Sequence, residues 1–324
     1  MEIKKIMTAR RYVTEVCYDL VQEWEDVLKE QMQIDFSTFS FEVNNSLFYR
    51  AANRIFDINI FRDMSLKFDM VPWGSSNPYN SRKIIPCIID FFQPDERLQW
   101  FEKGYSRSPL VLISSREVYD YLIDRNCRLK IAHWPLSLSD KYRITGGTKY
   151  DKLYDLSLLG GHHNPVLTEY LKQYVEEHPA FEYVFTKKED NHFCLYKSTG
   201  AFLGYNDTRS QYMDIMRKSR CCLYSTPGTD NTKAGNYGFS QVTPRLFEML
   251  ASGCHVIARY VNNSDTDYFN LPKIVEHCDD YERFRFLLDK ARNEDVDMGK
   301  NAVFLENHYT SQRVSLLNEI LNKL

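Results

Sequence analysis

In the second half of the chain, short apolar runs alternate with longer segments whose apolar residues recur every three or four positions. The short runs have the length of strands, and the periodic segments have the spacing of amphipathic helices. This pattern predicts strands at 154–159, 181–186, 221–225 and 255–260, and helices at 164–177, at 210–219 and after Thr243. Alternation of this kind is typical of a parallel sheet with crossover helices, so we expect a Rossmann-like α/β domain.

The first half of the chain shows the same two patterns less regularly. Helices are predicted at 10–32, 41–56 and 116–124, and strands at 84–92, 110–114 and 128–133. These elements indicate a second, smaller α/β domain. The Gly146-Gly147 pair predicts a boundary, which gives domains of residues 1–147 and 148–302. A C-terminal helical segment, 303–324, is expected to pack back toward the N-terminal domain.

The best-defined predicted helix starts and ends on clear signals. Thr243 suits the N-cap, Pro244 suits the first helical position, and Gly253 suits the position just after the last turn. Its apolar residues fall on one side, where they are expected to pack on the sheet: Leu246, Phe247, Leu250 and Ala251.

Two charged residues of this helix carry candidate chemistry. A helix N-terminus with Arg245 beside it can hold a phosphate, and Glu248, one turn further on, can accept hydrogen bonds from two sugar hydroxyls. The alternative is an exposed ion pair between the two, contributing well under ~1 kcal/mol. The first interpretation is favoured because a long loop precedes the helix and because its N-terminus would lie at the carboxyl edge of a parallel sheet.

Two other segments contain candidate binding residues. Gly160 and Gly161 end a strand and would let a ligand approach the backbone, although the full GxGxxG pattern is absent. His162 and His163 follow them and are interpreted as loop residues in preference to metal ligands. The loop 226–242, with Thr226 and Lys233, is a candidate cover for a phosphate-bearing ligand.

Asp90 is the candidate catalytic residue. It ends a buried run at the carboxyl end of a predicted strand, where a carboxylate can act as a base or bind sugar hydroxyls. The alternative is an aspartate that only forms a turn.

Composition narrows the classes of function. The hydrophobic fraction of 43% and the charged fraction of 26% are those of an ordinary globular protein, and a net charge of −3 argues against a nucleic-acid partner. Eight cysteines without a CxxC pair indicate reduced core residues in a cytoplasmic protein. No apolar run approaches the ~18 residues that span a bilayer, which leaves peripheral membrane contact open.

Residues 217–228, followed by Pro244-Arg-Leu-Phe-Glu-Met-Leu-Ala-Ser-Gly-Cys254, resemble the donor half of GT-B glycosyltransferases. The CgeB-like (glycosyl transferases group 1) and exostosin-like families are the nearest in pattern, and the tail 306–313 is similar to that of the first family. The resemblance implies two Rossmann-like domains facing across a cleft. It also implies metal-independent transfer, without a cofactor, from a nucleotide diphosphate-sugar donor to a glycan or lipid-linked acceptor held mainly by the N-terminal domain.

Residue roles follow from the same resemblance. Glu248 would bind the ribose hydroxyls, Arg245 and the amides around Thr243 would bind the diphosphate, and Gly160 and Gly161 would line the cleft. Many of these enzymes carry a second glutamate, eight residues before the first, that contacts the donor sugar; here that residue is Ser240. Two alternatives therefore stay open: a non-catalytic protein that binds sugar nucleotides, and a sugar-nucleotide epimerase on the same fold.

Overall fold

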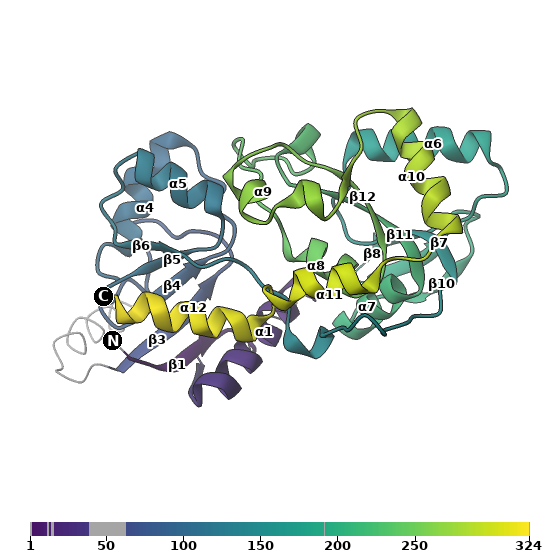
Figure 1. Cartoon of the computed structure of the whole chain (residues 1–324). Coiled ribbons are helices and arrows are strands. Elements are labelled where there is room, and N and C mark those ends of the chain that lie inside the picture. The colour runs from purple at the N-terminus through teal and green to yellow at the C-terminus, as the bar shows by residue number, and fades with distance from the viewer. Residues whose placement is uncertain (1, 12, 14–15, 39–62, 191, 324) are drawn as a thin grey trace. The chain divides into compact units, whose positions relative to one another are not determined.

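A computed structural model describes residues 2–11, 13, 16–38, 63–190 and 192–323. The chain divides into two compact units, each built around one sheet (Figure 1). Unit 1 comprises residues 1–140 and 309–324, and unit 2 comprises residues 141–308. A 3-10 turn, Asp140–Tyr142, lies where the chain passes from unit 1 to unit 2.

The sheet of unit 1 is parallel throughout its described strands. Its order is β2 (Asp35–Thr38), β1 (Glu2–Thr8), β3 (Asp63–Asp69), β4 (Ile84–Ile88), β5 (Val111–Ile113) and β6 (Ile131–His133). The chain runs from β1 outward to β2 and then returns to β3 on the other side of β1. The strand order therefore reverses between β1 and β3, which is the topological switch point of this unit.

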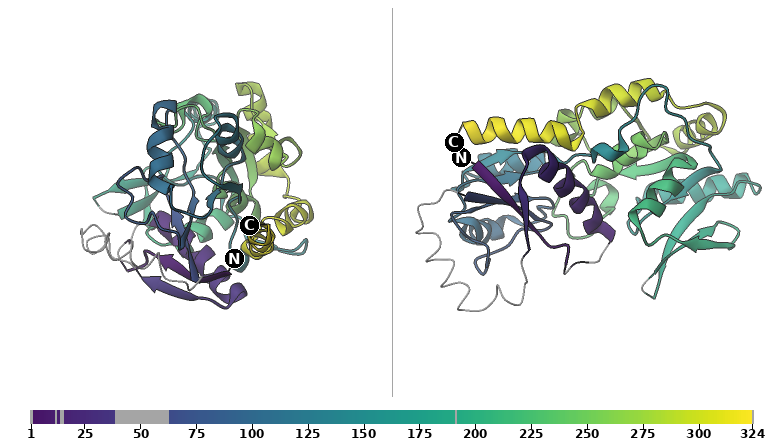
Figure 2. Two further views of the ribbon diagram at one scale, coloured as in Figure 1. Left: turned by 90° about the vertical axis from the view of Figure 1, so that its left-hand side faces the viewer. Right: turned by 90° about the horizontal axis from the view of Figure 1, so that it is seen from below.

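Helices α1 (Val16–Met32) and α12 (Thr310–Asn322) lie side by side in unit 1 (Figure 2). They share one core with the sheet, in which Leu28 and Leu317 pack with Ile6, Leu66 and Ile85. Hydrogen bonds also hold α12 in place, because Trp134 Nε1 donates to the Arg313 carbonyl at 2.9 Å. Among the described residues, unit 1 also contains the 3-10 turn Asp95–Arg97, α4 (Leu98–Tyr105) and α5 (Arg116–Asp124).

The sheet of unit 2 is mixed. Its order is β10 (Phe202–Tyr205), β9 (His192–Lys197), β8 (Val184–Glu189), β7 (Tyr154–Leu158), β11 (Ser219–Ser225), β12 (His255–Arg259) and β13 (Glu276–His277). The pairs β8–β9 and β9–β10 are antiparallel, and the other pairs are parallel. The switch point lies between β7 and β11, because the chain goes from β7 to β8 on one side and later to β11 on the other.

Two groups of helices accompany this sheet. Helices α6 (Pro165–Glu177) and α10 (Tyr281–Asn293) pack on it together, with Tyr174 and Phe284 in a core that includes Leu156 and Ile257. Helix α8 (Pro244–Ala251) contacts α7 (Arg209–Arg217), α11 (Met298–Glu306) and strands β11 and β12. Shorter elements are α9 (Ser264–Tyr268) and the 3-10 turns Thr229–Asn231 and Leu271–Lys273.

The predicted fold class is confirmed: the chain is α/β, with two Rossmann-like units and a C-terminal helix that belongs to unit 1. Three predicted elements are corrected. In the segment 10–32 the described helix is Val16–Met32, and a strand that the sequence pattern missed, β1, precedes it. The segment 303–324 contains parts of two helices and not one, because the backbone is extended at Tyr309. The strand predicted at 181–186 starts at Val184 and continues to Glu189.

The remaining sequence expectations concern one further helix, the cysteines and membrane-spanning segments. The helix predicted at 41–56 lies outside the described residues. Six cysteines are free and buried, and Cys127 is free and half-buried: the six are Cys87, Cys194, Cys221, Cys222, Cys254 and Cys278. In the part of the chain that the structure describes, no helix is long and apolar enough to cross a membrane.

Candidate functional site

A pocket opens at the switch point of unit 2. It is lined by residues that follow β7, by the end of β11, by the first turn of α6 and by one residue of α8: His162, His163, Asn164, Leu167, Thr168, Leu223, Tyr224, Ser225 and Arg245. Open α/β sheets bind ligands at this place, outside the carboxyl ends of the strands where the order reverses. The pocket is an open crevice, so it can contact only one part of a ligand, such as a phosphate group.

Asn164 shapes one wall of this pocket. It is the N-cap of α6, and its side-chain oxygen accepts a hydrogen bond from the Leu167 amide at 3.0 Å. Its amide nitrogen donates to Asp230 at 3.0 Å, and Asp230 is paired with Arg259 at 2.6 Å. This network fixes the start of a long helix whose positive dipole end lies at the pocket.

Gly160 and Arg245 are in close contact at the pocket. Gly160 has a φ of +95°, and a Cβ built on it would lie 2.5 Å from Arg245 Nη2. On the other side, Arg245 Nη1 donates to the His162 carbonyl at 3.5 Å. Gly161, by contrast, has no heavy atom within 4 Å of a built Cβ. The two predicted glycines therefore differ, since only Gly160 has both a left-handed backbone and a close neighbour.

His163 is an uncharged pocket residue at neutral pH. Burial, together with the charge of Arg245, lowers the pKa of its imidazole to about 4. The Gly160 backbone bond opposes this shift without cancelling it. The pocket thus contains one cation, Arg245, beside a histidine that an incoming anion would help to protonate.

Helix α8 follows the sequence prediction at both ends. It starts at Pro244 after an extended Thr243, and Gly253 has the left-handed φ of +63° that the helix end requires. Thr243 makes no capping bond with its side chain; its amide donates to the Tyr224 hydroxyl at 3.0 Å.

The sequence predicts that Arg245 and Glu248 form a polar side of α8, and this prediction is wrong. Every residue of the helix is buried except Arg245, because α8 contacts neighbouring elements on several sides. Glu248 is 3% exposed, and its ion pair at 2.5 Å is with Arg209, the first residue of α7. The alternative interpretation of an exposed Arg245–Glu248 ion pair is therefore also wrong.

The loop 226–242 is held by its own hydrogen bonds. Ser240 and Thr226 are both fully buried; the Ser240 hydroxyl donates to Thr226 Oγ1 at 2.7 Å and accepts from the Gly228 amide at 3.1 Å. Ser240, at the position where many GT-B enzymes carry the sugar-binding glutamate, thus makes hydrogen bonds that hold the loop together. Lys233 lies in the same loop and is not among the described residues that line the pocket.

Asp90, the candidate catalytic residue, belongs to unit 1, whereas the candidate donor-binding residues belong to unit 2. It follows β4, is half-buried, and its amide donates to the Met70 carbonyl at 3.0 Å. Its catalytic role stays a prediction.

Of the predicted site residues, the structure brings Gly160 and Arg245 together, with Glu248 buried within the same helix as Arg245. Sequence reasoning missed Arg209 as the partner of Glu248 and did not predict that His163 and Asn164 line the pocket. For Asn164 a signal existed, because Asn-Pro marks a helix start at a strand's carboxyl end. No group of three or more His, Cys, Asp or Glu residues that could hold a metal ion occurs among the described residues.

No protein-family model matches the chain, and no curated protein matches its sequence. Among solved structures it is similar to the pneumococcal O-GlcNAc transferase GtfA in complex with UDP and GlcNAc, at 11% identity and a TM-score of 0.48. That match covers 85% of this chain and 59% of the length of the transferase.

Two further solved structures are similar. The glycotransferase of kitacinnamycin matches at 9% identity and a TM-score of 0.44, with 98% of both chains covered. UDP-GlcNAc 2-epimerase from Methanocaldococcus jannaschii matches at 8% identity and a TM-score of 0.47, with both chains fully covered. At these identities and TM-scores, function has to be argued from the site itself.

Proposed function

We propose that the chain is a glycosyltransferase of the hexosyltransferase type, and that the pocket of unit 2 binds the diphosphate of a nucleotide diphosphate-sugar. The observation that carries the proposal is the Arg245 guanidinium against Gly160 at the switch point. A guanidinium and a helix N-terminus are the groups that bind a diphosphate, because both present N–H donors with positive charge. The segment 244–254, by which the sequence resembles the donor half of GT-B enzymes, contains Arg245.

Transfer requires stabilisation of the leaving diphosphate as negative charge develops on it. The N-terminal dipole of α6 is fixed before the reaction, and Arg245 lies at the same pocket, so both can stabilise that charge. In this proposal transfer needs neither a metal nor a cofactor. Lys233 and the amides around Thr243 would add contacts from the neighbouring loop.

Glu248 is proposed to bind the ribose hydroxyls. Its carboxylate pairs with Arg209 at 2.5 Å, and charge-assisted hydrogen bonds are stronger than those between neutral groups. In this proposal the Arg209–Glu248 pair positions the nucleoside. The sugar is recognised by other residues, since Ser240 is enclosed in its loop.

The acceptor is proposed to be a glycan or a lipid-linked molecule, with Asp90 of unit 1 as the base that removes its proton. The proposed location is the cytoplasm, with peripheral contact to a membrane where the acceptor is lipid-linked. We propose no nucleic-acid partner. Binding without catalysis remains the second candidate function, and the enclosure of Ser240 is the observation that favours it.

A panel of nucleotide sugars tests the proposal. The protein is incubated with UDP-, GDP-, ADP- and CMP-linked sugars, and free nucleotide and altered sugar are measured with and without added acceptors. Release of nucleotide that depends on Arg245 supports a transferase. An epimerised sugar in the absence of acceptor supports an epimerase, and binding without any product supports a non-catalytic protein; either result would overturn the proposal.

A further inference from the structure

Arg209, the first residue of α7, contacts a carboxylate and two aromatic rings. Its Nη2 donates to Glu248 Oε1 at 2.5 Å. Its guanidinium carbon lies 5.5 Å from the ring centroid of Tyr142 and 5.4 Å from that of Tyr212. Both distances are within the range of cation–π attraction, which is stronger where water is excluded. The side chain of Arg209 is 11% exposed, so these contacts are largely shielded from water.

Tyr142 comes to this cluster from a different part of the chain. Tyr212 lies on α7 itself, three residues after Arg209, whereas Tyr142 ends the 3-10 turn through which the chain enters unit 2. Tyr142 is buried, and its ring centroid also lies 5.6 Å from the guanidinium carbon of Arg217, the last residue of α7. One ring therefore contacts the arginines at both ends of α7.

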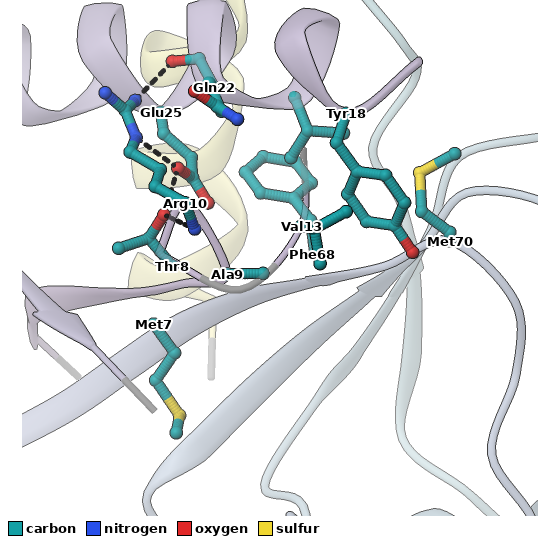
Figure 3. Close-up of a pocket in the computed structure, with 11 residues that line it drawn as sticks. Met7, Thr8, Ala9, Arg10, Val13, Tyr18, Gln22, Glu25, Phe68 and Met70 are labelled. Atoms are coloured by element: carbon teal, nitrogen blue, oxygen red, sulfur yellow. Dashed lines mark hydrogen bonds and ion pairs between the residues drawn. The ribbon is translucent and has the colours of Figure 1, made fainter. Parts of the chain in front are cut away.

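Unit 1 contains a comparable arginine–glutamate pair, which is drawn in Figure 3. Arg10 Nε donates to Glu25 Oε2 at 3.0 Å, and the same oxygen accepts from the Thr8 hydroxyl at 2.7 Å. Glu25 thus accepts two hydrogen bonds from its own unit. Among the described residues, the Glu248 carboxylate accepts one, from Arg209. An ionised carboxylate has about four acceptor positions, so Glu248 retains capacity for a ligand.

The ring contacts restrain Arg209 without using its hydrogen-bond donors. A guanidinium that lies over an aromatic ring keeps its N–H groups in its own plane, where they can still bond a carboxylate. The orientation of Arg209 in turn decides which acceptor positions of Glu248 are occupied and which ones remain for a ligand. Loss of the Tyr142 ring removes one of the two attractions and lets the guanidinium rotate.

We infer that Tyr142 is a positioning residue for nucleoside selection: through Arg209 it holds the Glu248 carboxylate in the orientation that accepts the two ribose hydroxyls. The inference rests on the proposed function, in which Glu248 binds the ribose. It goes further by assigning the choice of a ribonucleotide over a deoxyribonucleotide donor to a residue at the entry of the chain into unit 2.

Titration calorimetry on the full chain tests the inference with UDP, GDP, ADP and CDP, each compared with its 2′-deoxy form. The wild type should prefer the ribose form of the best ligand about tenfold. Tyr142→Leu should reduce this preference to under about twofold, and Tyr142→Phe should keep it, because the ring is retained. Tyr150→Leu is the matched control: its ring contacts Arg217 at 5.4 Å, so its loss should leave the preference unchanged.

A change of ring charge provides the second measurement and disturbs packing less than leucine does. Tyr142→Phe is compared with the same variant carrying 3,4,5-trifluorophenylalanine at residue 142, in which fluorine reduces the negative charge of the ring face. We expect the fluorinated protein to lose at least threefold of the ribose preference. Its preference for a diphosphate over a monophosphate, which is assigned to Arg245, should not change.

The outcomes separate this inference from the proposed function. A ribose preference that survives both Tyr142→Leu and fluorination, or that Tyr150→Leu abolishes equally, overturns the role of Tyr142 and leaves the donor site standing. A wild type that binds nucleotides without preferring ribose also overturns the inference alone, because Arg245 can still bind the diphosphate. If no nucleotide binds the wild type, the proposed function and the inference are both wrong.

Discussion

A methyl group at residue 160 would lie 2.5 Å from Nη2 of Arg245, so Gly160 leaves the space that this guanidinium occupies. Gly160→Ala should therefore displace the Arg245 side chain, which is flexible at its far end. It should also add about 1–2 kcal/mol of backbone strain, because φ at this residue is +95°. We expect affinity for a nucleoside diphosphate to fall at least tenfold, as measured by titration calorimetry.

Gly161→Ala is the matched control for that substitution. No heavy atom lies within 4 Å of a Cβ built on Gly161. This variant should therefore bind the nucleoside diphosphate with the affinity of the wild type and have the same melting temperature. Equal affinities for Gly160→Ala and Gly161→Ala would show that the contact with Arg245 has no part in binding.

Substitution of Glu248 separates its pairing with Arg209 from its proposed contact with ribose. Glu248→Gln leaves Arg209 without a carboxylate at a buried site, which should cost about 3 kcal/mol of unfolding free energy in urea. The wild type should prefer a nucleotide to its 2′-deoxy analogue about tenfold, and the variant should lose this preference. Glu282→Gln breaks an exposed pair with Arg285 and should cost under ~1 kcal/mol. An unchanged 2′-deoxy preference in Glu248→Gln would leave Glu248 with a structural role only.

The pH dependence of diphosphate binding reports on His163. Its pKa is lowered to about 4 in the free protein, and a bound anion next to it favours the imidazolium and raises that pKa. Binding at pH 5 should therefore take up protons, and affinity should rise as the pH falls through the raised pKa toward 4. Calorimetry in two buffers of different ionisation enthalpy measures this uptake. The ligand's own phosphate takes up the same number of protons in all variants. His163→Gln should therefore lose the part of the proton uptake that comes from His163, whereas the control His192→Gln should retain it.

Ser240 is expected to stabilise the loop and not the sugar. Ser240→Ala removes bonds to Thr226 and to the Gly228 amide and should cost about 1–2 kcal/mol in unfolding free energy. Ser240→Glu should cost more, because the residue is fully buried. Ser252→Ala is the control, since this buried hydroxyl has no hydrogen-bond partner among the described residues. A glutamate at residue 240 that is tolerated and raises turnover would contradict this interpretation.

The sequence predicts the fold well where local signals coincide with packing. Thr243, Pro244 and Gly253 mark a helix that the structure places at Pro244–Ala251, and Asn164 marks the start of α6. The strand β1 was missed because Ile3, Ile6 and Met7 are interspersed with charged residues and fall within a pattern that also fits a helix. Strand β10 was missed because its apolar residues face solvent, so they lack the alternation of a half-buried strand.

The candidate site is only partly predictable, for a physical reason. The charge of Arg245 and the glycine at residue 160 are visible in the sequence, but their contact joins α8 to the end of β7. The pairing of Glu248 with Arg209 joins two helices far apart in sequence, and no periodicity relates them. The same holds for the burial of Ser240, which depends on how the loop closes on Thr226.

The most direct test of the central claim compares a nucleoside diphosphate with its monophosphate, using the base that gives the largest rise in melting temperature. The wild type should bind the diphosphate at least tenfold more tightly. Arg245→Ala should lose that preference, while Arg285→Ala, a substitution on the exposed side of α10, should keep it. If Arg245→Ala retains the full preference, or if no nucleotide binds the wild type, the unit 2 pocket is not a donor site.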